Sequence, residues 1–149
     1  LDQLLPQAKF LLVTTPQPTA QKVARRSAEM AHKVSLEIAG VVENMSGFTT
    51  PDGARHPIFG EGGGQELADE LDVPLLGRVP LTIALREQAD AGTPLVAVDP
   101  DDPAAQATRQ VARGLIALTP MDLPVVAAGE QGEPTAQPAP TGMSLPMAG

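Results

Sequence analysis

Two short apolar runs on either side of a helical stretch constrain the fold of this chain more than any other feature. Residues 10–15 and 37–43 are mostly aliphatic, and turn-forming residues follow each run closely. Runs of this length with such boundaries are typical of buried strands. Between them, apolar residues from 20 to 34 recur at helical spacing, and Thr19 stands where an N-cap is expected. A strand, a helix and a second strand in about 35 residues form a βαβ unit, so we expect parallel strands.

The pattern after this unit continues an α/β domain. A third short apolar run at residues 73–80 ends in proline, and we expect it to be a strand. Asp102 followed by Pro103 predicts the start of a helix that runs to Leu118. The fold class indicated by these elements is α/β with a parallel sheet. The other expected segments are a polar loop at 48–57, a helix at 65–71, an irregular helix at 81–91 and an extended segment at 95–98.

Composition narrows the classes of function. The chain has 149 residues, is 42% hydrophobic, and carries a formal net charge of −8 with scattered Lys and Arg residues. A nucleic-acid groove needs a basic stripe, so we expect no nucleic-acid partner. No apolar run approaches the roughly 18 residues of a membrane span, and no signal peptide is visible, so we expect a cytoplasmic protein. The absence of cysteine excludes disulfides and any thiolate metal or cluster site supplied by this chain.

Polar or turn-forming residues end all three expected strands, where open α/β sheets bind ligands. Asn44 ends the second strand, and its carboxamide suits the edge of a purine or, equally, a cap on the following turn. Thr14, Thr15 and Pro16 end the first strand, where they orient a water or phosphate or simply form a turn. Pro80 ends the third strand, either as a strand stop or beside a base pocket.

The Gly-rich run at residues 60–64 has two readings. Glycines at the start of a helix expose backbone N–H groups that favour anions, and they also form structural turns. A P-loop requires a Gly-Lys pair and a dinucleotide fold requires G-x-G-x-x-G after the first strand, and the sequence has neither. His32 and His56 are not in metal-ligand spacing, so we assign them no role.

Four segments, in order along the chain, resemble the Mrp (ApbC-like) family of iron–sulfur cluster carrier ATPases, relatives of the MinD and ParA ATPases with a deviant Walker A motif. The resemblance covers residues 1–118 and implies a parallel-sheet, P-loop NTPase-like fold of the MinD/ParA type that binds ATP with Mg²⁺. It also implies a homodimer, and iron–sulfur client or scaffold proteins as partners. The segments are Val-Thr-Thr-Pro-Gln at 13–17, Gly-Val-Val-Glu-Asn-Met-Ser at 40–46, Ile-Phe-Gly-Glu-Gly-Gly-Gly at 58–64 and Val-Pro-Leu-Leu-Gly-Arg-Val-Pro-Leu at 73–81.

The resemblance also implies roles for individual residues. By position, Asn44 would hydrogen-bond the adenine, and Pro80 and Leu81 would line the base pocket. Thr15 and Pro16 would lie near the phosphates. We therefore expect this chain to supply the adenine side of a nucleotide site.

Two departures from the family pattern limit what this chain does alone. The family's P-loop lysines and Walker B aspartate lie upstream of Leu1, which is no initiator methionine, so residues 1–118 are expected to be the C-terminal half of the ATPase domain. Such a chain should not hydrolyse ATP by itself. The family's Cys-x-x-Cys pair is also missing from the loop after Ser46, so a bridged iron–sulfur cluster is not expected there.

Two further expectations complete the interpretation. Residues 119–149 are rich in Pro and Gly and lack periodicity, so we expect a disordered tail. The alternative function is a non-catalytic, MinD/ParA-like module that binds or positions a partner protein.

Overall fold

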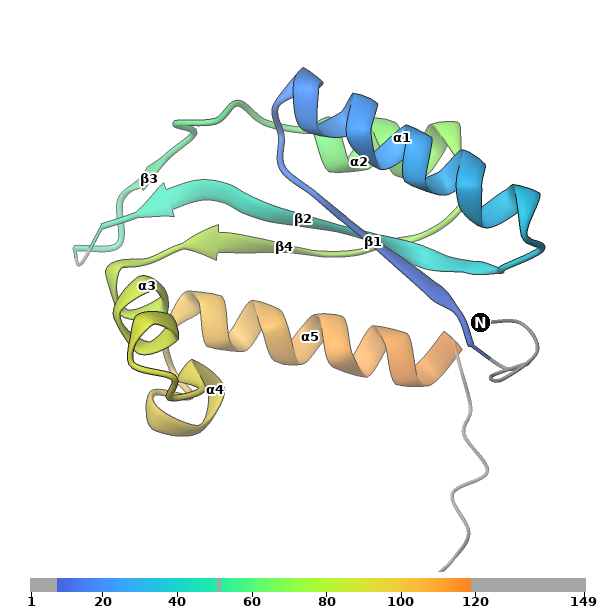
Figure 1. The fold of residues 1–149 in the computed structure, drawn as a ribbon. Coiled ribbons are helices and arrows are strands. Elements are labelled where there is room, and N and C mark those ends of the chain that lie inside the picture. The colour runs from blue at the N-terminus through green and yellow to red at the C-terminus, as the bar shows by residue number, and fades with distance from the viewer. Residues whose placement is uncertain (1–7, 51, 119–149) are drawn as a thin grey trace, which may run out of the picture.

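The computed structural model describes residues 8–50 and 52–118, in which helices cover both faces of a small sheet (Figure 1). The expected tail at 119–149 lies outside the described residues. No helix in the described ranges is long and apolar enough to cross a lipid bilayer. The strands are β1 (Phe10–Thr14), β2 (Ile38–Thr49), β3 (Arg55–His56) and β4 (Leu75–Leu81). The helices are α1 (Pro18–Lys33), α2 (Gly63–Glu70), α3 (Ile83–Asp90), α4 (Leu95–Val98) and α5 (Pro103–Leu118).

β2 is the central strand of the sheet. It pairs in parallel with β1 along one edge and with β4 along the other, which confirms the predicted βαβ unit and the third strand. β3 runs antiparallel to the end of β2, through the pairs Phe48–His56 and Thr49–Arg55. Because Phe48 pairs with Leu81 of β4 on its other side, β3 lies on the same edge of β2 as β1.

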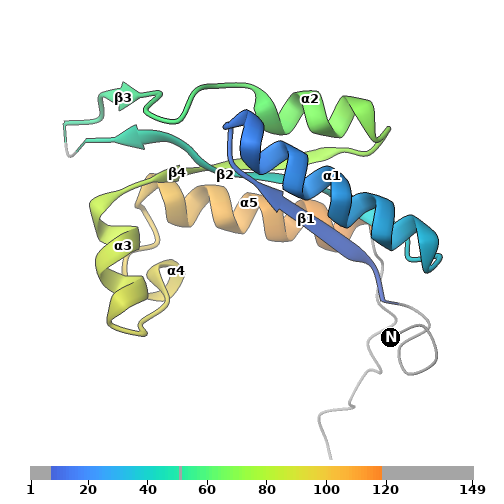
Figure 2. The ribbon, with the colours of Figure 1, turned by 45° about the horizontal axis from the view of Figure 1, so that its top comes forward.

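The helices form two layers around the sheet. α1 and α2 cover one face and α5 covers the other, with α3 and α4 near one end of α5 (Figures 1 and 2). Small side chains on α1, such as Ala24 and Ala28, let this helix approach the sheet closely and pack on Leu12 and Val41. The buried core residues are aliphatic, in a chain that has three Phe and no Trp or Tyr. The main cluster consists of Leu12, Ala24, Ala28, Val41, Leu67 and Ala68, and a second one of Leu95, Ala104 and Ala105.

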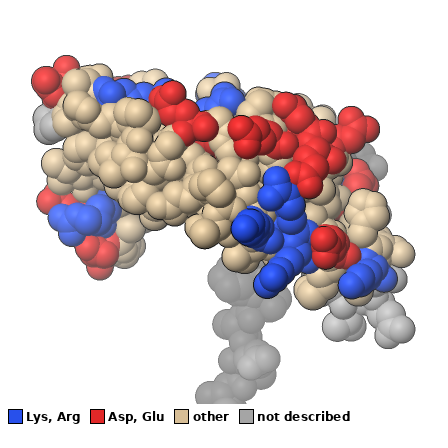
Figure 3. Space-filling view, turned by 90° about the horizontal axis from the view of Figure 1, so that it is seen from above, with Lys and Arg blue, Asp and Glu red and all other residues tan. Residues whose placement is uncertain are grey.

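The surface above α1 and α2 carries charges of both signs. Acidic and basic side chains are interspersed on this face, and the basic ones do not form one continuous stripe (Figure 3).

α1 begins two residues earlier than a Thr19 N-cap would place it, so that prediction was wrong. The helix starts at Pro18, and Gln17 is the N-cap without a side-chain hydrogen bond. Proline has the φ angle of a helix and lacks an N–H that would be left unpaired in the first turn. The restricted backbone of Pro18 therefore sets the start of the helix, and a side-chain cap is not needed.

β2 is longer than the sequence indicates, and this corrects the expected loop at 48–57. The strand does not end at Asn44: it passes through an irregularity and continues to Thr49. Met45 and Gly47 have positive φ angles of 55° and 85°, which interrupt the regular pairing. Pairing with β3 then stabilises the extension, and alternation within residues 45–49 is too weak to predict it.

A tight turn closes the β2–β3 hairpin. The Thr50 hydroxyl donates to the carboxylate of Asp52 and lies 2.9 Å from the carbonyl oxygen of Ala54. The hydrogen bond from Thr50 holds the pKa of the Asp52 carboxyl below its ordinary value. The turn has the Asp and Gly composition that the sequence analysis associates with a loop, but it joins two paired strands.

Residues 95–98 form the short helix α4, so the predicted extended segment was wrong. Leu95 is buried against Ala104 and Ala105 at the start of α5, and this contact outweighs the local preference of Val96 and Val98 for extended backbone. The start of α5 agrees with the prediction. The Asp102 carboxylate accepts a hydrogen bond of 2.7 Å from the N–H of Ala104.

The Gly-rich run has a packing role in this fold. A Cβ atom added to Gly63 would lie 2.5 Å from the carbonyl oxygen of Pro16, and one added to Gly64 would lie 2.6 Å from Cβ of Glu43. The first turn of α2 therefore packs directly against β2 and the β1–α1 turn. This contact supports the reading of the run as a structural turn.

Glu43 is the charged residue at the centre of this packing. Its side chain is fully buried, at 0% exposure. One carboxylate oxygen accepts a 2.6 Å hydrogen bond from the Ser46 hydroxyl, and the other accepts one of 2.6 Å from the N–H of Gly64. The Nε atom of Arg78 lies 3.7 Å from the first oxygen. These partners replace the water that a carboxylate loses on burial.

We expect Gly64→Ala to destabilise the fold by about 1–3 kcal/mol, because the added methyl group would overlap Glu43 on a packed strand. The measurement is the free energy of unfolding in urea. Gly114→Ala in α5 is the control, since its added Cβ would lie 3.5 Å from Leu76, an ordinary contact. That control should gain about 0.5–1 kcal/mol. Equal effects of the two substitutions would contradict the close packing.

We expect Glu43→Ala to cost about 3 kcal/mol or more, because it leaves buried donors on Ser46 and Gly64 without an acceptor. Glu43→Gln should cost less, since the amide oxygen still accepts one of these bonds. Urea unfolding of both variants is compared with that of Glu61→Ala, which removes the same charge from an exposed position. A loss for Glu43→Ala no larger than for Glu61→Ala would show that the buried network does not stabilise the fold.

Candidate functional site

The predicted site residues lie along the edge of the sheet at which β1 and β4 end. β2 pairs Asn44 with Val79 of β4, so Pro80 follows one position later on the neighbouring strand. On the other side of β2, β1 ends at the pair Thr14–Glu43, directly before Asn44. The structure therefore brings the carboxyl end of β1, the middle of β2 and the end of β4 together. The five predicted positions at this edge are Thr15, Pro16, Asn44, Pro80 and Leu81.

Asn44 is half-buried and makes a local hydrogen bond. Its Oδ1 atom accepts from the N–H of Met45 at 2.9 Å. This is the capping role that the sequence left open, and it supports Met45 at its positive φ angle of 55°. Within the described residues the Nδ2 group has no hydrogen-bond partner, so the side chain keeps two donors and one oxygen lone pair for a ligand.

The β1–α1 turn is held by side chains near its backbone. The carbonyl oxygen of Pro16 accepts a 3.0 Å hydrogen bond from Nε2 of Gln21, a residue that is 5% exposed. The Thr15 hydroxyl lies 3.5 Å from Oε1 of Gln17. Both contacts shape the turn, and the half-buried Thr15 hydroxyl keeps contact with solvent.

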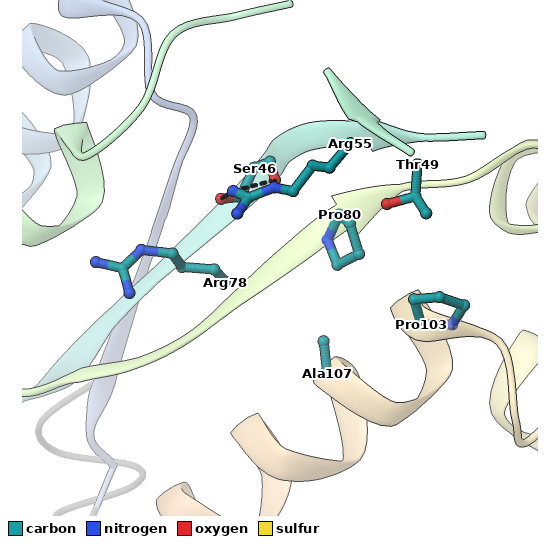
Figure 4. A pocket seen from close by; sticks show the side chains of 7 residues that line it. All are labelled: Ser46, Thr49, Arg55, Arg78, Pro80, Pro103 and Ala107. Carbon is teal, nitrogen blue, oxygen red and sulfur yellow. Dashed lines mark hydrogen bonds between the residues drawn. The ribbon is translucent and has the colours of Figure 1, made fainter. Parts of the chain in front are cut away.

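The end of β4 lies between two cavities. Pro80 lines a cavity of about 290 Å³ together with Ser46 and Thr49 of β2 (Figure 4). A second cavity of about 540 Å³ follows at Thr82 and Ile83, next to the β2–β3 hairpin. Pro80 thus lies one residue before the end of β4 and lines a cavity. Asn44 lines neither of these two cavities.

Sequence reasoning missed Glu43, Arg55 and Arg78 as members of this region. A glutamate inside an apolar run was the available signal, because a carboxylate in a buried strand requires hydrogen-bonding partners. Those partners come from Gly64 and Arg78, which are distant in sequence, so the pattern alone did not identify them. Arg55 lay in the segment interpreted as a loop.

The described residues offer no metal centre. They contain no group of three or more His, Asp or Glu side chains placed to hold a metal ion. The whole sequence also lacks cysteine, so no thiolate of this chain ligates iron.

Comparison with known proteins places the chain in a family. Residues 1–116 match the family described as ParA, the NUBPL iron-transfer P-loop NTPase. The chain is 47% identical over 119 residues to the iron–sulfur cluster carrier protein of Mycobacterium leprae, a match that covers 76% of this chain and 31% of that protein. The chain thus spans about a third of the length of the curated relatives it matches.

Solved structures agree with this assignment. The cell division ATPase MinD of Pyrococcus furiosus superposes with a TM-score of 0.57 at 28% identity, covering 72% of this chain and 42% of MinD. MinD of Pyrococcus horikoshii, solved in complex with Mg-ADP, gives a TM-score of 0.55 at 25% identity and covers 68% and 38%. These likenesses confirm the predicted P-loop NTPase-like fold of the MinD/ParA type. The chain belongs to the ParA/NUBPL family of iron-transfer P-loop NTPases.

Proposed function

We propose that this chain supplies the adenine side of the nucleotide site in an ATP-dependent iron–sulfur cluster carrier. The observation that supports the proposal is the position of Asn44 beside the end of β4, with the β1–α1 turn on the other side of β2. Its relatives are named iron–sulfur cluster carrier proteins, and a MinD neighbour was solved with Mg-ADP.

Asn44 has the chemistry that adenine recognition requires. Adenine presents an amino donor next to a ring-nitrogen acceptor, and a carboxamide matches this pair with its oxygen and its NH₂ group. The bond from the Met45 N–H fixes which end of the carboxamide is the oxygen. A fixed amide favours adenine over guanine, because guanine presents the reverse pattern at the same edge.

The other predicted residues complete the proposed site. Pro80 and Leu81 line the base pocket through apolar and backbone contact. Thr15 and Pro16 lie near the phosphates, at the start of α1. Each of these roles is consistent with a position along the sheet edge, and each can be tested by substitution.

The described residues bring together no group of three or more acidic or histidine side chains that could hold a metal ion without a nucleotide. Mg²⁺ would therefore depend on phosphate oxygens and on groups outside the described residues. The iron–sulfur cluster is the cargo in this proposal, and its thiolate ligands would come from outside these 149 residues, which contain no cysteine.

The proposal extends to assembly and location. We propose a homodimer that works in the cytoplasm with iron–sulfur client or scaffold proteins. The rival function is a partner-positioning module, which the likeness to the cell division ATPase MinD favours. A Lys-Gly-Gly-x-Gly-Lys-Ser/Thr motif in the upstream coding sequence would support the ATPase, and its absence would exclude ATP hydrolysis.

In a full-length protein that contains this sequence, we expect Asn44→Ala to weaken ADP binding by about 1–3 kcal/mol, because one or two hydrogen bonds to adenine are lost. Calorimetric titration measures the affinity. Asn44→Asp is the sharper variant: it keeps an oxygen for the Met45 N–H but removes the NH₂ donors.

The control for both Asn44 variants is Gln110→Ala, which removes a carboxamide from an exposed position on α5. Its affinity for ADP should equal that of the unchanged protein. If Asn44→Asp binds ADP as tightly as this control, Asn44 does not recognise the base.

We expect the 149-residue chain by itself to show no Mg²⁺-dependent ATP hydrolysis, because its sequence contains no Gly-Lys pair to hold the β- and γ-phosphates. Phosphate release at millimolar ATP is the measurement, with an intact MinD as the positive control. Turnover that depends on Mg²⁺ and persists after repeated purification would contradict this expectation.

A further inference from the structure

Two arginines from different elements line the cavity at Pro80. Arg55 belongs to β3 and Arg78 to β4, and both line the cavity of about 290 Å³ beside Ser46 and Thr49. Figure 4 shows both side chains extending in the same general direction, with the guanidinium group of Arg55 beside Ser46 and that of Arg78 farther from Pro80. The adenine proposal uses neither arginine.

Arg55 is held in place by the backbone and side chain of Ser46. Its Nη2 atom donates to the Ser46 carbonyl oxygen at 2.9 Å and to the Ser46 hydroxyl at 3.1 Å, and Nε donates to the same carbonyl at 3.2 Å. Gly47 makes this position accessible, because a Cβ atom there would lie 2.7 Å from Nε of Arg55. The guanidinium is thus positioned before any ligand arrives, and its Nη1 group has no partner among the described residues.

Arg78 is oriented by two other side chains. Nε lies 3.7 Å from the buried carboxylate of Glu43, and Nη2 donates to Oε1 of Gln65 at 3.3 Å. The Arg78 side chain is 44% exposed, so it is accessible to a small ligand. Ser46 connects the two arginines through Glu43, since its hydroxyl donates to the same carboxylate oxygen at 2.6 Å.

The charges in this cluster do not cancel. Glu43 is the one carboxylate within ion-pair distance of either arginine among residues 8–50 and 52–118. Two guanidinium groups therefore share a single negative charge, in a chain whose net charge is −8. Guanidinium groups form paired hydrogen bonds to phosphate and carboxylate, so a local excess of positive charge in a cavity favours an oxyanion.

We propose that Arg55 and Arg78, with the hydroxyl of Thr49, form a binding site for a small free oxyanion, of which inorganic phosphate is the test case. Two guanidinium groups that line one cavity suit a small anion, because they form paired hydrogen bonds to its oxygens. The site is separate from the proposed phosphate region at Thr15, which lies beyond the end of β1. The proposal goes beyond the nucleotide function and does not depend on it.

The first experiment is an NMR titration of the full chain with sodium phosphate at constant ionic strength, balanced with sodium chloride. We expect saturable shifts of the Nε–H signals of Arg55 and Arg78 and of the amide of Thr49. Shifts that do not saturate, or that chloride reproduces, would overturn the proposal. Saturable shifts of the Thr15 amide in place of these signals would also overturn it, because the anion would then occupy the proposed phosphate region of the nucleotide site.

The second experiment measures the phosphate affinity of variants. Arg55→Gln should bind phosphate at least about tenfold more weakly, since charge-assisted hydrogen bonds are lost. Arg78→Lys keeps a positive charge beside Glu43 and should also weaken binding, because lysine lacks the paired donors. Arg26→Gln on the exposed side of α1 removes one charge elsewhere and should leave the affinity unchanged.

The amide spectrum of each variant shows whether it folds. Two arginine variants are used so that the test still applies if one of them does not fold. Undiminished phosphate affinity in the folded arginine variants would overturn the proposed site. So would an equal loss of affinity in Arg26→Gln, because binding would then follow net charge alone.

Discussion

The buried carboxylate of Glu43 is the interaction on which the arrangement around the sheet edge depends. Burial of a carboxylate costs several kcal/mol unless hydrogen bonds and a countercharge replace its water. Here the N–H of Gly64 and the hydroxyl of Ser46 supply two hydrogen bonds, and Arg78 supplies the countercharge. These contacts connect α2, the irregular part of β2 and β4. A change at Glu43 is therefore expected to affect three elements at once.

The position of Glu43 next to Asn44 links stability to the proposed recognition of adenine. Asn44 follows the residue that holds β2 against α2, and it precedes the irregular backbone at Met45. The carboxamide is thus held on a strand rather than on a flexible loop. A rigid donor and acceptor pair loses less conformational entropy on binding, which suits a site that distinguishes one base from another.

Sequence reasoning predicted the parts of the candidate site that lie within single segments. The positions of Thr15, Asn44 and Pro80 follow from where apolar runs end, and their alignment follows from parallel pairing. The hydrogen bond from the Met45 N–H to Asn44 was one of two open alternatives. Arg55 and Arg78 could not be associated from the sequence, because the β2–β3 hairpin that brings Arg55 to Ser46 was interpreted as a loop.

The sequence by itself determined the βαβ unit, the third strand, the helix that starts after Asp102 and the family. Each depends on periodicity, caps or ordered motifs that act over a few neighbouring residues. Only the tertiary structure decided the extension of β2 to Thr49, the short helix α4 and the partners of Glu43. These features depend on contacts between segments that are distant in the chain, and such contacts override weak local preferences.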